Sequence, residues 1–228
     1  MADNPDPRFS PLADGSPSAS ASSTTSPPIS WTIRIISKQT PEGRNFFHDH
    51  YRPFRLKMLK EAPYAYTSTY QRTAVHTPEQ WDARWSTPNA THFIALLSPL
   101  DPNSNPKIIS ALTLRGPFPT SELTSPVWQQ FGTAGCSSYW EINGVFTDEA
   151  YRRLGVARSV MEEVVRMVER ERRGEKTLMT LGVLAGNEEA VGVYEKAGFV
   201  DRWPDGGGWE MVRFLGGGEG GEGVGFGG

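Results

Sequence analysis

The 228-residue chain lacks several residue types and patterns, and each absence excludes a class of protein. Its one cysteine, Cys136, excludes an intramolecular disulfide and any CxxC metal or redox site. No apolar run approaches the length of a membrane span, and the formal net charge of −3 gives no general case for binding nucleic acid. His48, His50, His76 and His92 lie apart or lack acidic companions, so no metal site is predicted.

The two ends of the chain differ in composition from its middle. Residues 1–30 are rich in Ser, Pro, Ala and Thr, and residues 216–228 are nearly all Gly and Glu, so we expect a disordered segment and a flexible tail. The first residues are acidic and have no basic segment followed by an apolar one, so no targeting peptide is predicted. We expect one domain at 31–215 in a cytoplasmic protein, with the nucleus as the alternative. It would be a monomer or homodimer without nucleic-acid or membrane partners.

Segments typical of strands alternate with segments of helical period in the middle of the chain. Strands are expected near 31–36, 92–97, 107–114, 140–146, 177–184, 200–203 and 209–214, and helices near 44–61, 77–85, 154–171 and 187–197. A turn is expected at 38–43, and Pro53 should kink or break the first helix. Thr77 and Gln80 fit a capping box. Residues 116–138 read as an insertion with one short helix near 127–131. This order predicts an α/β (α+β) domain of six to seven strands and about four helices.

The joint between the strand at 140–146 and the helix that follows carries the strongest pattern in the chain. It reads Arg152-Arg153-Leu154-Gly155-Val156-Ala157. Two cations and a residue without a Cβ thus lie where a helix exposes unpaired N–H groups, which attract anions. On these six residues alone, a pyrophosphate cradle and a solvated basic helix start are equally supported. The pattern is neither a P-loop nor a GxGxxG motif.

The joint resembles the acetyl-CoA loop of the GNAT superfamily of acyl-CoA-dependent N-acetyltransferases, Q/R-x-x-G-x-G/A, at Arg152, Gly155 and Ala157. A second pattern typical of that superfamily, N-x-x-A-x-x-x-Y followed by G-F, reads Asn187, Ala190, Tyr194, Gly198 and Phe199. The resemblance spans about 31–215 and is sharpest over 140–199. It implies a mixed, strongly twisted sheet whose fourth and fifth strands splay apart to form the cofactor cleft. Gly144 is then the expected position of a bulge in the fourth strand.

By this resemblance, acetyl-CoA would be bound by the fourth strand, the loop after it and the two helices that follow. The expected cofactor-binding residues are Val145, Phe146, Thr147, Arg152, Arg153, Leu154, Gly155, Val156, Ala157, Arg158, Asn187 and Tyr194. Tyr194 matches the family position that protonates the coenzyme A thiolate, although its place on an apolar helical stripe also fits a core aromatic. Asn187 is expected to cap its helix, and that role alone would explain it.

Acetyl transfer to an amine requires a base, because an alkylamine has a pKa of about 10 and is protonated near pH 7. Glu141 in the fourth strand is the expected base, directly or through water, and a solvated strand-end glutamate is the alternative. Strand alternation puts Glu141, Asn143 and Val145 on one face, so Asn143 is a candidate for binding substrate. Tyr64 and Tyr66 are further candidates for the acceptor pocket, although each also fits an ordinary aromatic.

These residues together predict an N-acetyltransferase. It would transfer the acetyl group of acetyl-CoA to a primary amine of a small molecule or peptide, directly within a ternary complex, because no Cys or Ser lies in a nucleophile motif. The alternative is a non-catalytic acyl-CoA-binding or interaction module on the same fold. A nucleotide-binding protein lacks the Lys and Asp that such a site needs. The acceptor amine stays open, because variable loops form its pocket.

Overall fold

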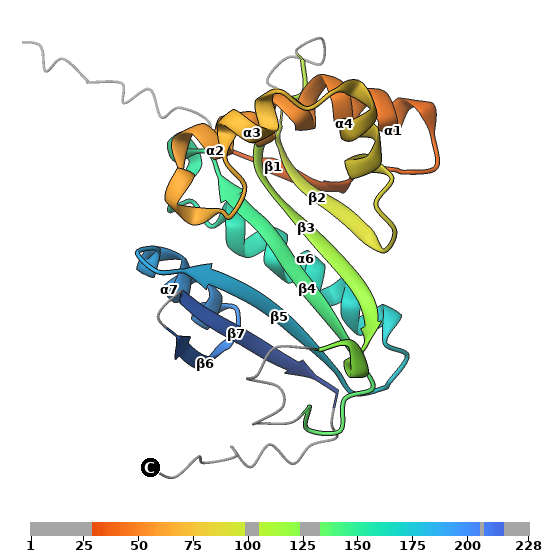
Figure 1. Cartoon of the computed structure of the whole chain (residues 1–228), viewed down its shortest axis with the longest axis vertical. Coiled ribbons are helices and arrows are strands. Elements are labelled where there is room, and N and C mark those ends of the chain that lie inside the picture. The colour runs from red at the N-terminus through yellow and green to blue at the C-terminus, as the bar shows by residue number, and fades with distance from the viewer. Residues whose placement is uncertain (1–28, 99–104, 124–132, 206–207, 217–228) are drawn as a thin grey trace, which may run out of the picture.

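The computed structural model describes residues 29–98, 105–123, 133–205 and 208–216 (Figure 1). Within these residues one sheet contains strands β1 (Trp31–Ile35), β2 (Ala90–Leu97), β3 (Ile108–Pro119), β4 (Ser138–Thr147), β5 (Thr177–Leu184), β6 (Val200–Asp205) and β7 (Gly208–Leu215). Their order is β1-β2-β3-β4-β5-β7-β6, and every neighbouring pair is antiparallel except β4 and β5. The predicted mixed sheet of six to seven strands is confirmed. Nearly all of the predicted N-terminal disordered segment, the tail beyond Gly216 and the predicted helix near 127–131 lie outside the described residues.

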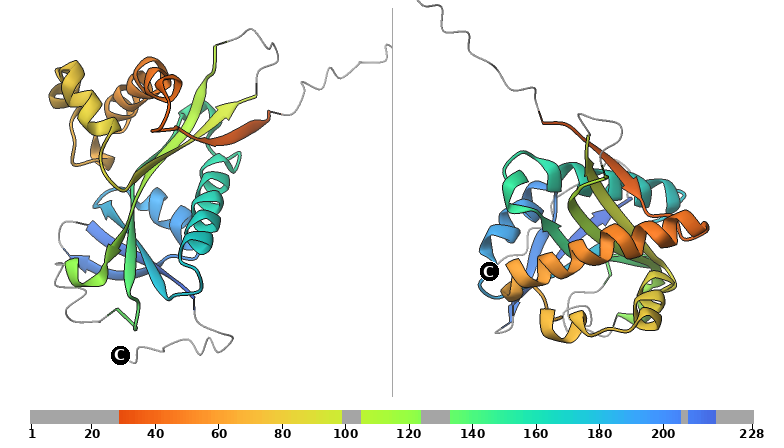
Figure 2. Two further views of the ribbon diagram at one scale, coloured as in Figure 1. Left: turned by 90° about the vertical axis from the view of Figure 1, so that its right-hand side faces the viewer. Right: turned by 90° about the horizontal axis from the view of Figure 1, so that it is seen from above.

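Helices cover both faces of the sheet (Figure 2). They are α1 (Pro41–Phe46), α2 (Arg52–Glu61), α3 (Tyr70–Ala74), α4 (Pro78–Trp85), α6 (Val156–Glu171) and α7 (Glu188–Lys196), with the π-helical turn η1 (Phe47–Tyr51) and the 3-10 turns η2 (Pro63–Ala65), η3 (Thr120–Glu122) and η4 (Glu149–Tyr151). In β2, Phe93 and Ala95 pack in the cluster with α6, whereas Ile94 and Leu96 pack in the cluster with α2 and α4. Strand alternation therefore supplies a core on each face of the sheet.

The first helical segment differs from its prediction in two ways. The turn expected at 38–43 is wrong, because α1 already begins at Pro41, where the Thr40 hydroxyl accepts a hydrogen bond from the Gly43 N–H (3.2 Å). Pro53 does not break the helix. The turn before it widens into η1, in which the Arg52 N–H donates to the Phe47 carbonyl five residues earlier. This wider turn accommodates a proline, which has no N–H to donate. The capping box at α4 is confirmed.

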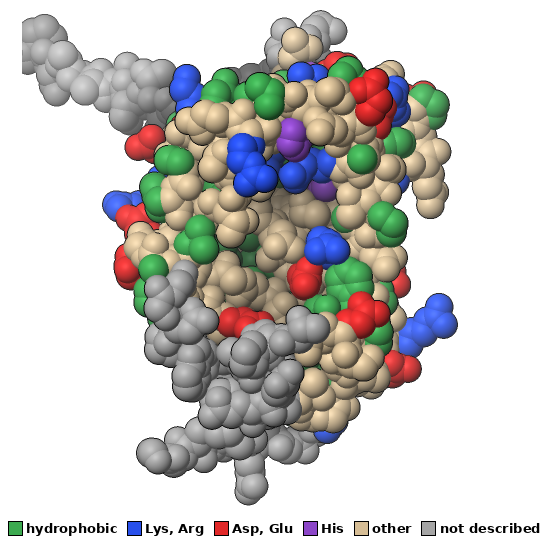
Figure 3. Space-filling model, in the orientation of Figure 1, with side chains coloured by type: hydrophobic (Ala, Val, Ile, Leu, Met, Phe, Trp, Pro, Cys, Tyr) green, Lys and Arg blue, Asp and Glu red, His purple; other side chains and the backbone are tan. Residues whose placement is uncertain are grey.

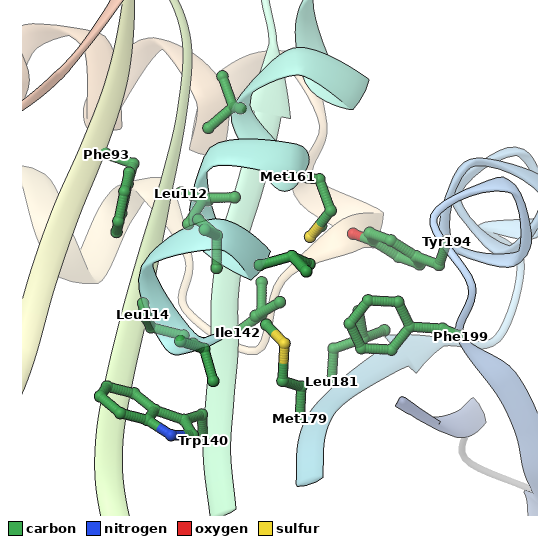
Figure 4. Close-up of a cluster of buried hydrophobic side chains, with 14 of the residues drawn as sticks. Phe93, Leu112, Leu114, Trp140, Ile142, Met161, Met179, Leu181, Tyr194 and Phe199 are labelled. Carbon is green, nitrogen blue, oxygen red and sulfur yellow. The ribbon is translucent and has the colours of Figure 1, made fainter. Parts of the chain in front are cut away.

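Helix α6 lies at the centre of the larger core (Figure 4). Its buried residues repeat at helical spacing and are Val156, Val160, Met161, Val164, Val165 and Val168. The predicted apolar stripe is confirmed, but the helix begins at Val156 rather than near Leu154. The reason is Gly155, whose left-handed backbone (φ 86°) ends the preceding turn before the helix starts.

Strands β4 and β5 pair over only part of their length. Residues 138–141 pair in parallel with 177–180, and no pairing between the two strands continues beyond Glu141. On its other edge β4 carries one extra residue against β3, at Gly144, whose φ is 63°. Such a bulge bends the strand. The expected splay of the fourth and fifth strands and the expected bulge are therefore both present, and a cleft opens between the two strands.

Candidate active site

The cleft between β4 and β5 holds a cavity of about 1140 Å³, and the space-filling view shows the hollow on this face (Figure 3). β4 lines one side of the cleft, and β5, β7 and α7 line the other. Further lining residues come from η1, α2, the segment after α2, α4, β2 and β3. The predicted site residues that line it are Tyr66, Glu141, Asn143, Val145, Asn187 and Tyr194. Residues far apart in the sequence thus meet in one cavity large enough for a small-molecule ligand.

Glu141 lies where β4 and β5 part, since it is the last residue of β4 that pairs with β5. Across the sheet it pairs with Arg115 of β3, whose Nη1 lies 3.0 Å from Glu141 Oε2. The glutamate side chain is 32% exposed. The ion pair therefore fixes the direction of the carboxylate at the mouth of the splay while leaving part of it accessible from the cavity.

Tyr66 connects the segment after α2 to β4. Its hydroxyl donates a hydrogen bond to the Val145 carbonyl at 2.7 Å. Burial raises the pKa of Tyr66, so it remains a phenol that can donate this bond at neutral pH. Tyr64, the other tyrosine predicted to bind substrate, is 55% exposed and is not among the residues around the cavity. Of these two tyrosines, only Tyr66 therefore lies at the site.

Tyr194 lies on α7 and is 8% exposed. Its ring packs on Phe199 with the ring centroids 6.3 Å apart, and its hydroxyl points toward α6 and Met161 (Figure 4). Burial raises the pKa of Tyr194 above its usual value, so the group stays protonated at neutral pH. The core position considered from the sequence is therefore confirmed, and because Tyr194 also lines the cavity, its role as the acid stays a prediction.

The residues predicted to bind pyrophosphate lie at the N-terminus of α6, outside the cavity itself. Gly155 stands at the N-cap position, where it offers no side chain, so the first amides of α6 have no capping partner. A Cβ at Gly155 would meet no atom within 4 Å, so the approach to these amides is open. Arg153 adopts a left-handed backbone (φ 62°) and its side chain is exposed.

The remaining predicted cofactor residues surround this helix start in different ways. Arg152 Nε donates to the Thr147 carbonyl (3.2 Å), and its guanidinium lies over the Phe146 ring. The side chains of Phe146 and Val156 are buried, which leaves only their backbone groups to contact a ligand. Leu154 is 45% exposed. Ala157 is half-buried, and Arg158 pairs with Glu162 one turn along the helix (2.7 Å).

Asn187 occupies the N-cap position of α7, but its side chain makes no capping hydrogen bond. The expectation that it caps the helix through its side chain is therefore wrong. Its backbone takes φ −114° and ψ 49°, and its carbonyl accepts from the Ala190 N–H instead. Because Asn187 lines the cavity, its amide is available to a ligand there. At the other end of α7, the Phe199 N–H donates to the Tyr194 carbonyl and Gly198 is left-handed, which confirms the predicted helix end.

Sequence reasoning missed the cavity residues of the first helical segment and of β3. The main ones are Arg55 of α2 and Arg115 of β3. Arg55 had a detectable signal, because it lies four residues after Tyr51 and three before Met58 on the apolar stripe of its helix. A cation at such a position either pairs in the core or faces a site. Arg115 had no signal, since it lies just past the predicted end of its strand, which is longer than predicted.

Two other features are absent from the described ranges. No three His, Cys, Asp or Glu side chains gather there in a way that would hold a metal ion. No helix in the same ranges is long and apolar enough to cross a membrane.

Comparison with known proteins identifies the class. The model of the acetyltransferase (GNAT) family matches residues 56–199, so this chain belongs to the GNAT family. No curated protein matches the chain. Arabidopsis thaliana NAA60 in complex with a bisubstrate analogue shares the fold, with a TM-score of 0.53 and 16% identity over 82% of this chain and 99% of that one. For the complex of the same protein with acetyl-CoA, the TM-score is 0.53 and the identity is 17%, over 82% of this chain and 99% of that one.

A GNAT-family acetyltransferase from Streptococcus pneumoniae is similar to the same extent. Its TM-score is 0.53 and its identity 15%, over 82% of this chain and 100% of that one. At these identities the likeness to solved structures establishes the fold alone, and the family match carries the assignment to acetyltransferases.

Proposed function

We propose that this protein is an acetyl-CoA-dependent N-acetyltransferase that acts on a primary amine of a small molecule or peptide by direct transfer in a ternary complex. The observation that carries the proposal is that Glu141 and Tyr194, a base candidate and an acid candidate from distant segments, line one cavity. Membership of the GNAT family supports acyl transfer. Arabidopsis NAA60, which has the same fold, has been crystallised with acetyl-CoA and with a bisubstrate analogue.

The residues at the start of α6 fit the pyrophosphate of coenzyme A. The uncapped first amides and the open approach over Gly155 suit a bulky anion, and the helix dipole and Arg153 add positive potential. Main-chain groups near Val145 and the amide of Asn187 would contact the pantetheine arm in the cleft. Bound acetyl-CoA would supply the acetyl thioester, and residues of this chain would carry out the proton transfers.

Glu141 is the proposed base. The acceptor must lose a proton before its nitrogen can attack, and Glu141 can accept that proton directly or through one water at the mouth of the splay. Arg115 holds the carboxylate in place. Asn143 and Tyr66 also line the cavity and would contact the acceptor.

Tyr194 is the proposed acid. Its buried phenol keeps its proton at neutral pH, so it can donate to the sulfur of coenzyme A as the thioester is cleaved. An acyl-enzyme through cysteine is disfavoured, because Cys136 is buried with Tyr139, Leu178 and Val212 in a separate cluster. Burial also raises the pKa of its thiol, which reduces the thiolate that a nucleophile needs.

Binding and turnover test the proposal separately. Acetyl-CoA binding by calorimetry should be lost in Gly155→Glu, where a carboxylate would stand at the anion site, and should largely persist in Gly155→Asn. Asparagine is the matched control because it tolerates a left-handed backbone without adding charge. Turnover, followed as thiol release over a library of amines, should fall roughly 100-fold or more in Glu141→Gln. The proposal fails if Gly155→Glu binds acetyl-CoA normally, or if no amine stimulates thiol release.

The alternative is a non-catalytic acyl-CoA-binding or interaction module on this fold. The Glu141–Arg115 ion pair favours it, because the carboxylate is already engaged by a cation of the protein. The same amine library separates the two functions. Saturable acetyl-CoA binding without amine-stimulated thiol release would support the module.

A further inference from the structure

Arg55 is a buried cation without a carboxylate partner. The residue belongs to α2 and is only 7% exposed, and Phe54, Met58 and Leu59 of the same helix are buried too. Its Nη1 donates to the Met58 sulfur at 3.3 Å, and its guanidinium lies 5.4 Å from the centre of the Tyr66 ring. Within the described part of the chain its Nε is buried with no hydrogen-bond partner, and no ion pair involves it.

Such a group is costly to keep in a fold. A thioether is a weak acceptor, and an aromatic face replaces only part of the hydration that a buried cation loses. Burial lowers the pKa of Arg55, yet a guanidinium remains charged at any physiological pH. A buried cation is normally paired with an anion. The protein itself supplies none among the described residues, so the partner is to be sought in the space that Arg55 faces.

That space is the proposed acceptor side of the cavity. Arg55 lines the cavity together with Tyr66, Gly144 and Glu141. A Cβ on Gly144 would lie 2.9 Å from Arg55 Nη1, so the absent side chain of Gly144 lets the guanidinium lie directly against β4. Gly144 is three residues from Glu141, which is roughly 10 Å along a strand. One small acceptor can therefore span from Arg55 to Glu141.

The charges around the cavity are unevenly distributed. Arg84 of α4 lines the cavity as Arg55 does, and the lining residues of α2, of the segment after it and of α4 include no Asp or Glu. The lining carboxylates are Glu141, which pairs with Arg115, and Glu210 on β7 across the cleft. Lys and Arg side chains also gather with His at the upper margin of the hollow, whereas acidic side chains lie lower (Figure 3). The wall formed by α2 and α4 thus presents positive potential to a ligand.

We propose that the acceptor is an amine that also carries an anionic group, a carboxylate or a phosphate, which binds Arg55 while the amine faces Glu141. The proposal rests on the proposed acetyl transfer and narrows its substrate class. A guanidinium is suited to both anions, because its planar fork forms paired, charge-assisted hydrogen bonds with their oxygens. A polyamine, which would place a second cation against Arg55, is then a poor acceptor.

The experiment compares acceptors that differ only in the anionic group. ω-Amino acids of increasing length are paired with their carboxamides, phosphoethanolamine is paired with ethanolamine, and spermidine is included. For each one, kcat/KM for acetyl transfer and binding by calorimetry with saturating acetyl-CoA are measured. We expect the acid of a pair to exceed its neutral partner roughly 10- to 150-fold in kcat/KM, the range for a hydrogen bond to a charged group. The carboxylate and phosphate arms show which anion fits better.

Variants assign this preference to Arg55. In Arg55→Met, which keeps the length of the side chain without its charge, the ratio of kcat/KM between an acid and its neutral partner should fall to near one. In Arg55→Lys, which keeps the charge without the fork, part of it should remain. Lys60→Met is the matched control, because it removes a cation from an exposed position of the same helix and should leave the preference intact. Thermal melts of all variants check that they are folded.

The outcomes separate this inference from the proposed function. If neutral amines are acetylated as well as acidic ones, or if Arg55→Met keeps the preference, the inference is wrong and acetyl transfer stands. If no amine is acetylated but the acids bind in an Arg55-dependent way, the anion site stands and acetyl transfer is wrong. If neither acetyl transfer nor Arg55-dependent binding is observed, the anion site and the proposed acetyl transfer are both wrong.

Discussion

Replacing Tyr194 by phenylalanine should separate the chemistry of this site from its stability. The Tyr194 ring is buried against Phe199, and phenylalanine would keep that contact. Within the described residues no hydrogen bond from the Tyr194 hydroxyl is present, so its removal should change the free energy of unfolding by less than about 1 kcal/mol. If the phenol is the acid, kcat should fall roughly 100- to 10,000-fold, equivalent to about 2.7–5.5 kcal/mol in the barrier.

The assay follows thiol release at saturating acetyl-CoA and amine, together with thermal melting. The Michaelis constant for acetyl-CoA should change little, because the substitution removes an interaction of the transition state. Tyr66→Phe is the informative comparison. Its hydroxyl donates to Val145 at 2.7 Å, so its loss should cost about 1 kcal/mol, or roughly 2–4 °C in melting temperature. A Tyr194→Phe enzyme with a kcat within twofold of the wild type would refute the acid role.

Two further predictions concern stability. Burial and the nearby cations Lys38, Arg84 and Arg55 lower the pKa of His92 to about 3. Because the folded state holds the imidazole neutral, the depressed pKa stabilises the fold above the unfolded pKa of about 6.5. This stability is lost as the pH falls toward 3. The free energy of unfolding, measured in urea, should therefore drop by about 1.5 kcal/mol between pH 6.5 and 5, and a drop of the same size in His92→Asn would contradict this. Gly144→Ala should lower the free energy of unfolding by about 1–2 kcal/mol, because φ is positive there and the new Cβ would meet Arg55. An unchanged midpoint of urea unfolding would count against this prediction.

Local patterns in the sequence were sufficient for most elements of this fold. The period of α6 and the capping box at Thr77 and Gln80 depend on neighbouring residues, and both are confirmed. β5 was predicted with its observed bounds. Predictions failed where a local capping signal was overlooked, as at Thr40, or where the backbone took a different course, as at Asn187.

The candidate site was only partly accessible to sequence reasoning. Glu141 and Tyr194 belong to recognisable segments, so they could be proposed before their common cavity was known. The partner of Glu141 could not, because the Arg115–Glu141 pair depends on the register between β3 and β4. That register shifts at two places, and spacing along the chain does not reveal such shifts. The position of Arg55 beside Gly144 likewise exists only after α2 has packed on the sheet.

The short pairing of β4 with β5 has a thermodynamic consequence. Beyond Glu141, β4 and β5 face each other across the cavity. The main-chain N–H and C=O groups on these two facing edges pair with no neighbouring strand. The Tyr66 hydroxyl takes the place of a strand at one carbonyl, that of Val145. A ligand that supplies amide groups along this edge would complete the sheet from within. Substrate and stability are then linked, and a ligand at 100 times its Kd should stabilise the fold by about 2.7 kcal/mol, so melting shifts can reveal the ligands of this protein before any turnover is seen.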